Sequence, residues 1–252
     1  MKKNTHLLAL GACLASHVAT GATLAHRYSF DVGSELVDSV GGNTGVLNNG
    51  ATTGGGSLIL TGLGSSTGAN HMGFTNPVDI GGNFGATGVT IESWYTDTGT
   101  GTWGKLFQFG NNSAGQEFAY THTRGNGQQT GVDRDGAKLF GEQIAQNVEH
   151  HLVISVSADG NLNTWVDGAQ KITDLDTNDL INVSTAFEAI GATSWGDPGM
   201  NGEVNEFRIW SGELTSAEVS ANLSAGPDSV IPEPSALILA LAGGFFTLRR
   251  RR

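Results

Sequence analysis

The chain has 252 residues, room for one large domain or two small ones, and only 15% of its residues are charged. Its formal net charge is -11, although six of its 13 basic residues lie at the two ends: Lys2, Lys3, Arg249, Arg250, Arg251 and Arg252. That leaves seven basic residues against 24 acidic ones between the ends. A body this acidic repels anionic lipid headgroups and nucleic acid, and we expect no nucleic-acid partner.

The first 22 residues, MKKNTHLLALGACLASHVATGA, have the order of parts of a secretory signal peptide. Two lysines precede a short apolar stretch from Leu7 to Leu14, and small residues follow it. We therefore predict export through the Sec machinery and cleavage after Ala22, with Ala25 as the alternative position. A lipoprotein signal, in which Cys13 is lipidated, is a further alternative. Because Cys13 is the only cysteine, removal of this segment leaves no disulfide and no thiol chemistry.

Residues 23–226 form the predicted body, and nearly all of it has the pattern of short strands between turn residues. In segment 24–32 the alternation places five residues on one side of a strand: Leu24, His26, Tyr28, Phe30 and Val32. Further strands are expected in segments 56–62, 88–97, 104–111, 149–171, 187–192 and 201–212. Segment 149–171 is expected to hold two strands joined by an Asp-Gly turn. Many short strands without intervening helices predict an all-β fold of two antiparallel sheets packed as a sandwich.

One short surface helix is expected after the last strand. Thr215 and Glu218 have the spacing of a capping box, and Val219 and Leu223 share a face of the helix. Gly226, followed by a proline, predicts the end of the helix. We expect this helix to cover the edge of the sandwich.

Several of these segments occur in a familiar order. HRYSFD, TIESWYTD, HHLVISVSADGNLNTWVDG and NGEVNEFRIWSGELTSAEV together resemble the laminin-G-like members of the concanavalin A-like jelly rolls. The resemblance covers residues 24–226. It implies a jelly roll of two curved sheets with a concave face, a scaffold that in this family binds sugars or proteins or serves as a structural module.

The sequence offers no clear catalytic set, and we predict that the protein is not an enzyme. A retaining glycosidase needs two carboxylates about 5 Å apart, on one face of a strand or cleft. Three pairs of nearby carboxylates occur, namely Asp133/Asp135, Asp174/Asp176 and Glu203/Glu206. The first pair is expected in a hairpin turn, the second in a loop, and the third on opposite faces of a strand. His150 and His151 are adjacent on a strand and should also point to opposite faces.

The family resemblance implies one possible cofactor, a structural calcium ion held by carboxylates at the rim of the sandwich. The matching residues are Asp31, Asp38 and Glu206. Asn205 departs from the family pattern, because relatives often have aspartate there.

Tryptophans are the candidate ligand-binding residues. Trp165 and Trp210 lie within predicted strands and are expected in the core or half-buried. Trp103 and Trp195 lie in glycine-rich loops, where a large aromatic side chain is more suggestive of a binding site for sugar rings.

The C-terminal residues 227–252 have a different composition. Residues 235–248 carry no charge, but at 1.5 Å per residue they reach about 21 Å, short of a hydrocarbon core of about 30 Å. The ordered arrangement of Pro232, Glu233 and Pro234, an apolar helix, and the arginines at 249–252 resembles the PEP-CTERM sorting signal. It implies transient anchoring in the inner membrane, with the arginines on the cytoplasmic side, and cleavage by an exosortase.

These patterns together predict an exported protein of the cell surface or extracellular matrix, whose jelly roll binds polysaccharide or another surface protein. Two alternatives remain, a glycan-active enzyme on the same scaffold and a purely structural matrix protein.

Overall fold

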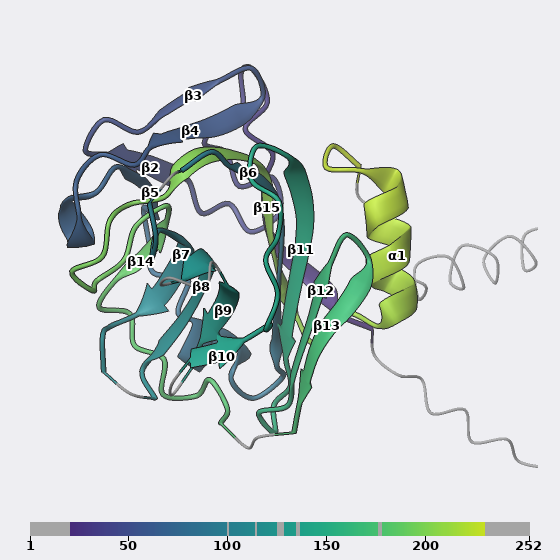
Figure 1. Cartoon of the computed structure of the whole chain (residues 1–252). Coiled ribbons are helices and arrows are strands. Elements are labelled where there is room, and N and C mark those ends of the chain that lie inside the picture. Colours follow the sequence, from purple (N-terminus) through teal and green to yellow (C-terminus); the bar gives the residue numbers. More distant parts are fainter. Residues whose placement is uncertain are drawn as a thin grey trace, which may run out of the picture.

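A computed structural model describes residues 21–99, 101–113, 115–124, 129–134, 137–175 and 178–229 of the chain. Within these residues the chain forms two antiparallel sheets packed face to face, with one α-helix outside them, as the strand pattern predicts (Figure 1). The predicted signal peptide up to residue 20 and the segment from residue 230 onward lie outside the described residues. Among the described helices, none is long and apolar enough to cross a membrane.

The larger sheet, here sheet A, has the strand order β13-β12-β11-β6-β15-β4-β3, and β1 also pairs with β15. Its strands are β1 (Thr23–Tyr28), β3 (Thr52–Gly54), β4 (Ser57–Thr61), β6 (Val89–Asp97), β11 (Glu149–Val156), β12 (Leu162–Val166), β13 (Ala169–Asp174) and β15 (Asn201–Ser211).

The other sheet, sheet B, has the order β10-β9-β8-β7-β14-β5-β2. Its strands are β2 (Gly45–Asn48), β5 (His71–Phe74), β7 (Lys105–Gly110), β8 (Glu117–Arg124), β9 (Gln129–Asp133), β10 (Ala137–Leu139) and β14 (Glu188–Ile190). A 3₁₀ turn at η1 (Ser66–Gly68), a π-helical turn at η2 (Ile80–Phe84) and the helix α1 (Ser216–Ala225) complete the described elements.

The main core fills the space between the two sheets. The strand predicted at 88–97 is confirmed as β6, whose side chains alternate, and Ile91 and Tyr95 enter this core with Phe107 of β7. Glu92 and Trp94, the residues between them, contact side chains on the face of sheet A turned away from sheet B, here its outer face. Both faces of β6 are buried, which indicates a second layer on the outer face of sheet A.

The predicted alternation holds for Tyr28 and Phe30, which both lie in the core between the sheets, but is wrong for Leu24 and Val32. The register with β15 shifts between Leu24 and His26, so a bulge at this point reverses the side of the sheet that later residues face. Leu24 therefore packs on the outer face of sheet A, whereas Tyr28 lies in the core between the sheets. Val32, which the alternation also placed on that side, is 86% exposed.

A second bulge corrects the prediction for Glu203 and Glu206. The register of β15 with β6 shifts between Val204 and Glu206, so Glu203 pairs with Thr96 and Glu206 with Trp94. Because Thr96 and Trp94 are two residues apart, both glutamates face the outer side of sheet A. They still form no catalytic pair, since Glu203 is exposed and Glu206 is fully buried in ion pairs.

The helix α1 has the predicted capping box, in which the Thr215 side chain accepts from the Glu218 N–H and the Glu218 carboxylate accepts from the Thr215 N–H. The helix ends at Gly226, as predicted. It packs on the outer face of sheet A, where Val219 joins a small core with Trp165 and Trp210, and so covers a face of the sandwich and not its edge (Figure 1).

Charged residues are buried beside this helix. Arg208 forms ion pairs with Glu92 and Glu206, and its Nη2 donates to the carbonyls of Pro227 and Ser229 at 2.6 and 2.7 Å. The last described residues are therefore fixed on the outer face of sheet A.

Candidate functional site

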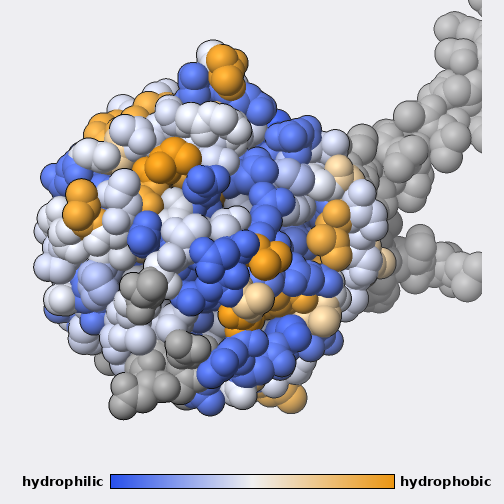
Figure 2. Space-filling view, turned by 45° about the horizontal axis from the view of Figure 1, so that its top comes forward, coloured by the Kyte–Doolittle hydropathy of each residue, from blue (hydrophilic) through white to orange (hydrophobic). Residues whose placement is uncertain are grey.

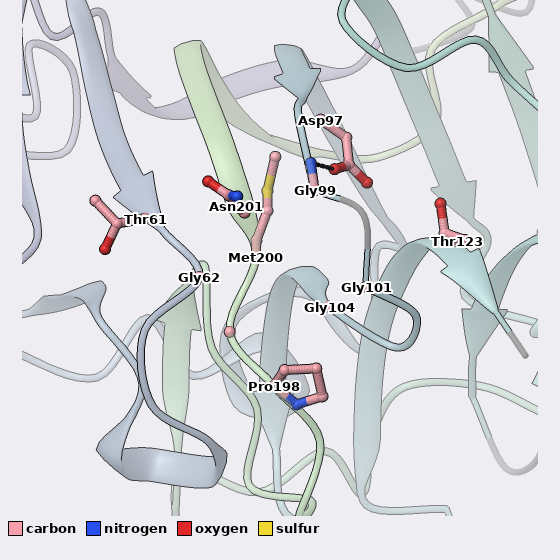
Figure 3. A pocket seen from close by; sticks show the side chains of 11 residues that line it. Thr61, Gly62, Asp97, Gly99, Gly101, Gly104, Thr123, Pro198, Met200 and Asn201 are labelled. Carbon is pink, nitrogen blue, oxygen red and sulfur yellow. Dashed lines mark hydrogen bonds between the residues drawn. The ribbon is translucent and has the colours of Figure 1, made fainter.

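A small cavity lies at one end of the sandwich, where three loops cross from one sheet to the other. These loops are residues 62–70, 98–104 and 191–200, which join β4 to β5, β6 to β7 and β14 to β15. Together they enclose a cavity of about 210 Å³, here the rim pocket (Figure 3). It is lined by Thr61, Gly62, Asp97, Gly99, Gly101, Gly104, Thr123, Pro198, Gly199, Met200 and Asn201.

Asp97 is the one ionisable residue among those that line the rim pocket. It ends β6, is 7% exposed, and its Oδ1 accepts from the Gly99 N–H at 2.7 Å (Figure 3). Burial raises the pKa of the Asp97 carboxyl above its ordinary value, although hydrogen bonds from Gly99 and the Gln146 amide oppose that shift. The pocket thus offers a fixed hydrogen-bond acceptor and no cation.

The remaining walls combine polar side chains, apolar side chains and backbone. Thr61, Thr123 and Asn201 supply hydroxyl and amide groups, and Figure 3 shows Met200 between Asn201 and the 99–104 loop. Gly62 has φ of +66°, and a Cβ there would lie 2.8 Å from the Asn201 Cβ. Glycine is therefore required at this position for the loop to approach β15 so closely.

A buried polar cluster lies between the sheets near this end and supports the site from behind. The Tyr95 hydroxyl is 2.7 Å from that of Tyr120 and 2.8 Å from His122 Nδ1. Burial, with the nearby His150, lowers the pKa of His122 to about 4, so its ring is neutral at ordinary pH. Since Tyr95 is two residues before Asp97 on β6, this network fixes the strand end that carries the pocket carboxylate.

The structure places the two predicted loop tryptophans in the loops that form the rim pocket, although neither is among its lining residues. Trp103 lies between Gly101 and Gly104, is half-buried, and donates its backbone N–H to the Thr123 carbonyl at 2.7 Å. Trp195 is 37% exposed. Trp165 and Trp210 are buried, which confirms that prediction.

Trp195 is held in a fixed orientation. Its indole Nε1 donates to Glu117 Oε2 at 2.7 Å, and its backbone N–H donates to the Thr193 hydroxyl at 3.0 Å. The loop is attached to sheet B through Gln108, whose Oε1 accepts from the Thr193 hydroxyl at 2.6 Å and from the Ser194 N–H at 2.8 Å. An exposed ring fixed in this way loses little conformational entropy when it binds a ligand.

Sequence reasoning missed the polar residues on the outer face of sheet B. Lys105 Nζ lies 2.7 Å from Asp133 Oδ2, 3.2 Å from the Thr121 hydroxyl and 3.9 Å from Asp197 Oδ2. The hairpin predicted around Asp133 is confirmed, because Asp133 pairs with Ala137 across β9 and β10. Strand β8, which carries Thr121, was not predicted, and the alternation in EFAYTHTR was the available signal.

The predicted calcium ligands have other partners. Asp38 accepts from the His26 ring and from the backbone N–H groups of Arg27, Val40, Gly41 and Asn43. Burial alone would raise its pKa, but these hydrogen bonds outweigh burial and hold the pKa of Asp38 well below its usual range. These bonds occupy the Asp38 oxygens that a calcium ion would need.

Glu206 accepts from Arg27 at 2.7 and 2.9 Å and also from Arg208, while Asp31 is exposed. In the described parts of the chain, no three histidine, cysteine, aspartate or glutamate residues converge on a metal site. The calcium site therefore stays a prediction that these contacts do not support. The predicted sorting residues Pro232, Glu233 and Pro234 lie outside the described residues.

Comparison with known proteins gives one family. A family model described as the concanavalin A-like lectin/glucanases superfamily matches residues 66–220, more than half of the chain. The comparison with curated proteins gives no match.

Solved structures share the fold at low sequence identity. Domain 4 of AbnA, an extracellular GH43 arabinanase from Geobacillus stearothermophilus in complex with arabinotriose, matches with a TM-score of 0.63 and 20% identity, over 80% of this chain and 98% of that one. A structure of botulinum neurotoxin type C, whose cell entry depends on interaction with two ganglioside molecules, matches with a TM-score of 0.55 and 12% identity. The binding domain of botulinum neurotoxin DC in complex with rat synaptotagmin II matches with a TM-score of 0.57 and 12% identity. Both toxin matches cover 80% of this chain but only 51% of the toxin chain, so this chain spans about half their length.

Proposed function

Because the chain belongs to the concanavalin A-like lectin/glucanase superfamily, we propose that it is an exported protein that binds carbohydrate through the rim pocket. The observation that carries the proposal is the chemistry of that pocket. A buried, fixed carboxylate, two threonines and an asparagine surround a small cavity that contains no cationic side chain.

This chemistry suits a sugar residue. Sugar hydroxyls donate to a carboxylate and exchange hydrogen bonds with hydroxyl and amide groups, as Asp97, Thr123 and Asn201 offer them here. Met200 gives an apolar wall for the C–H face of the ring. A cavity of about 210 Å³ is below the usual size for drug-like ligands, which favours one sugar residue over a long chain.

Two similar structures support a glycan ligand. Domain 4 of the arabinanase was solved with arabinotriose, and type C neurotoxin interacts with gangliosides. The similar DC toxin domain was solved with a protein partner, so the fold also accommodates a protein ligand. Figure 2 shows hydrophobic residues in small separate groups among hydrophilic ones on the face that it displays, which favours a polar ligand over a broad protein interface there.

Export and sorting form the second part of the proposal, and the sequence patterns at residues 1–22 and 227–252 support it. In this view the Sec machinery exports the protein, the inner membrane holds it through the tail, and an exosortase that reads Pro232, Glu233 and Pro234 releases it to the cell surface or matrix. Ser229 is fixed beside Arg208, whereas Asn201 of the pocket lies at the start of the same strand, roughly 20 Å away at 3.3 Å per residue. The last described residue is therefore held away from the pocket.

We propose binding without catalysis, because the carboxylates on the outer face of sheet B already have donors. Glu117 accepts from the Trp195 indole and Asp133 pairs with Lys105. A glycan-active enzyme is the alternative, and hydrolysis or elimination of any member of a broad polysaccharide panel would replace the proposal with it.

A glycan array probed with the full chain tests the binding site. Asp97→Ala removes the pocket acceptor and should weaken retention on the bound glycan by at least about tenfold, since hydrogen bonds to charged groups contribute about 1.5–3 kcal/mol. Glu203→Ala, an exposed glutamate on the outer face of sheet A, is the matched control and should change nothing. No retention on any glycan would favour a purely structural protein, and equal retention of the Asp97 variant would place the site elsewhere.

A further inference from the structure

A second cavity lies on sheet B and shares no lining residue with the rim pocket. It has a volume of about 230 Å³ and lies between β5 and the segment 185–188 that leads into β14. His71 and Gly73 line it, and they alternate along β5 with Met72, which belongs to the core between the sheets. His71 and Gly73 therefore place the opening of the cavity on the outer face of sheet B, and the cavity extends inward to Phe74, which packs against the core.

One wall of this cavity is aromatic. The rings of His71 and Phe187 meet edge to face with their centroids 5.7 Å apart. Phe187 is half-buried and packs against a small cluster of Ala69, Ala189 and Ala192, which supports the ring from one side. A supported phenyl ring at the side of a small cavity is a surface on which the C–H face of a sugar can pack.

The floor of the cavity is open because Gly73, on strand β5, has no side chain. A Cβ on Gly73 would lie 3.3 Å from Asn48 Nδ2, 3.8 Å from the Glu188 carbonyl and 3.9 Å from His71 Cδ2. Glu188 and His71 themselves line the cavity, so any side chain at this position would enter it. Glycine weakens a strand interior, and a close approach by a ligand is one of the recognised reasons for its presence.

Polar groups surround this surface in fixed positions. His71 Nδ1 donates to the Ala69 carbonyl at 2.8 Å, so Nε2 is the ring nitrogen left to bind a ligand. Asn76 is exposed, and both its backbone N–H and its carbonyl are bound by the Asn43 side chain at 3.0 and 2.8 Å. Glu188 holds the adjoining turn by accepting from the N–H groups of Val78 and Asp79.

The charge of the cavity limits the ligand. No lysine or arginine lines it, and the Glu188 carboxylate is already used by the two backbone donors. A ligand carboxylate, sulfate or phosphate would thus enter a cavity with no lysine or arginine to compensate its charge. A neutral ligand with one apolar face and several hydroxyl groups matches all the walls.

From these contacts we infer that the cavity between His71 and Phe187 is a second sugar-binding site, specific for an uncharged sugar residue packed on Phe187. The inference rests on the proposed carbohydrate-binding function but places it at a separate set of residues. One domain then holds two sugar residues at once, one in each cavity.

The test uses the isotope-labelled full chain and NMR titration with D-glucose, D-galactose, D-mannose, D-xylose, L-arabinose, N-acetyl-D-glucosamine and, as the anionic comparison, D-glucuronate. At least one neutral sugar should shift the backbone signals of Gly73 and Phe187, and glucuronate should shift them less. Gly73→Ala places a methyl group in the cavity, and Phe187→Ala removes the phenyl ring on which the sugar packs. Each should weaken this binding by about tenfold. Val46→Ala is the matched control, because Val46 pairs with Gly73 on β2, is exposed and does not line the cavity.

Three results would overturn the inference: no neutral sugar shifts these signals, glucuronate binds as well as the neutral sugars, or both cavity variants bind like the Val46 control. Two variants are used so that a folding defect in one does not decide the outcome, and signals far from the cavity report folding. Asp97→Asn separates the two sites. In that variant, a sugar should still shift the signals of Gly73 and Phe187. If it does so, and if no protein shows a shift at Thr123 or Asn201, the rim-pocket proposal is wrong while the inference for this cavity holds.

Discussion

Replacing Glu92 by glutamine should strongly destabilise the protein. Glu92 has no exposed surface and accepts from four side chains on the outer face of sheet A. These donors are His151 at 2.8 Å, Trp210 at 3.0 Å, Asn222 at 3.2 Å and Arg208 at 3.3 Å. Glutamine keeps the shape but replaces one acceptor oxygen by a donor group and removes the charge opposite Arg208.

The expected cost follows from what stays buried. Hydrogen bonds to a charged group contribute about 1.5–3 kcal/mol each, but four bonds to one carboxylate are not additive. Removing one partner of a buried ion pair typically costs about 3–5 kcal/mol, because the other charge stays in the interior. Because Arg208 keeps Glu206 as a partner, we expect the lower end of this range, a loss of about 3 kcal/mol in the free energy of unfolding and of roughly 6–12 °C in the melting temperature.

Urea unfolding followed by fluorescence measures this change, as a lower midpoint with an unchanged slope. Glu203→Gln is the matched control, since Glu203 faces the same side of sheet A but is exposed, and it should change stability by less than about 0.5 kcal/mol. A loss below about 1 kcal/mol for Glu92→Gln would refute the reasoning, because the network would then contribute little beyond its shape.

Four further predictions concern other parts of the chain. The pKa of Asp38 in the folded state is held below its unfolded value of about 4, so at acidic pH the unfolded state binds more protons at this residue. The stability that ionised Asp38 contributes is therefore present above about pH 4 and is lost as the pH falls. Urea midpoints measured from neutral to acidic pH should fall less in Asp38→Asn than in the natural protein, and identical profiles would contradict this. Thr215→Ala removes the N-cap and should cost about 1 kcal/mol in the same assay, whereas Ser216→Ala, the next residue, should cost little. If the predicted calcium site exists, calcium should raise the melting temperature and a chelator should lower it, and an unchanged melt rules the site out. Deletion of residues 230–252 should release a soluble export, and replacement of 232–234 should leave the full-length form uncut; continued membrane retention of the deletion, or normal cleavage of the replacement, would count against the sorting proposal.

The fold class was predictable because it depends on local patterns. Alternating residues in β6, the Asp-Gly turn between β11 and β12, and the capping box at Thr215 each follow from the preferences of a few neighbouring residues. The face of each residue was predictable only while the alternation continued. One extra residue near Leu24 and one near Asn205 reversed it, and a bulge has no reliable signal in a single sequence.

The candidate sites were only partly predictable. Composition and glycine-rich context pointed to the loops of Trp103 and Trp195, and these loops do form the rim pocket. Asp97 is the last residue of a predicted strand, and no local pattern in the sequence distinguishes Phe187 or His71 as a binding residue. A single chain shows that these residues exist, but not that segments around 71 and 187 become neighbours when β5 pairs with β14.

The sequence by itself determined that the protein is all-β, that its body is acidic and cysteine-poor, and that a capped helix follows the last strand. These properties arise from composition and from contacts between residues close in the chain. Only the tertiary structure decided that the helix covers a face of sheet A, that Asp38 and Glu206 are engaged by other partners, and that three separate loops enclose one pocket. Those outcomes depend on strand register and on pairings between distant segments, for which the free energy is distributed over the whole core.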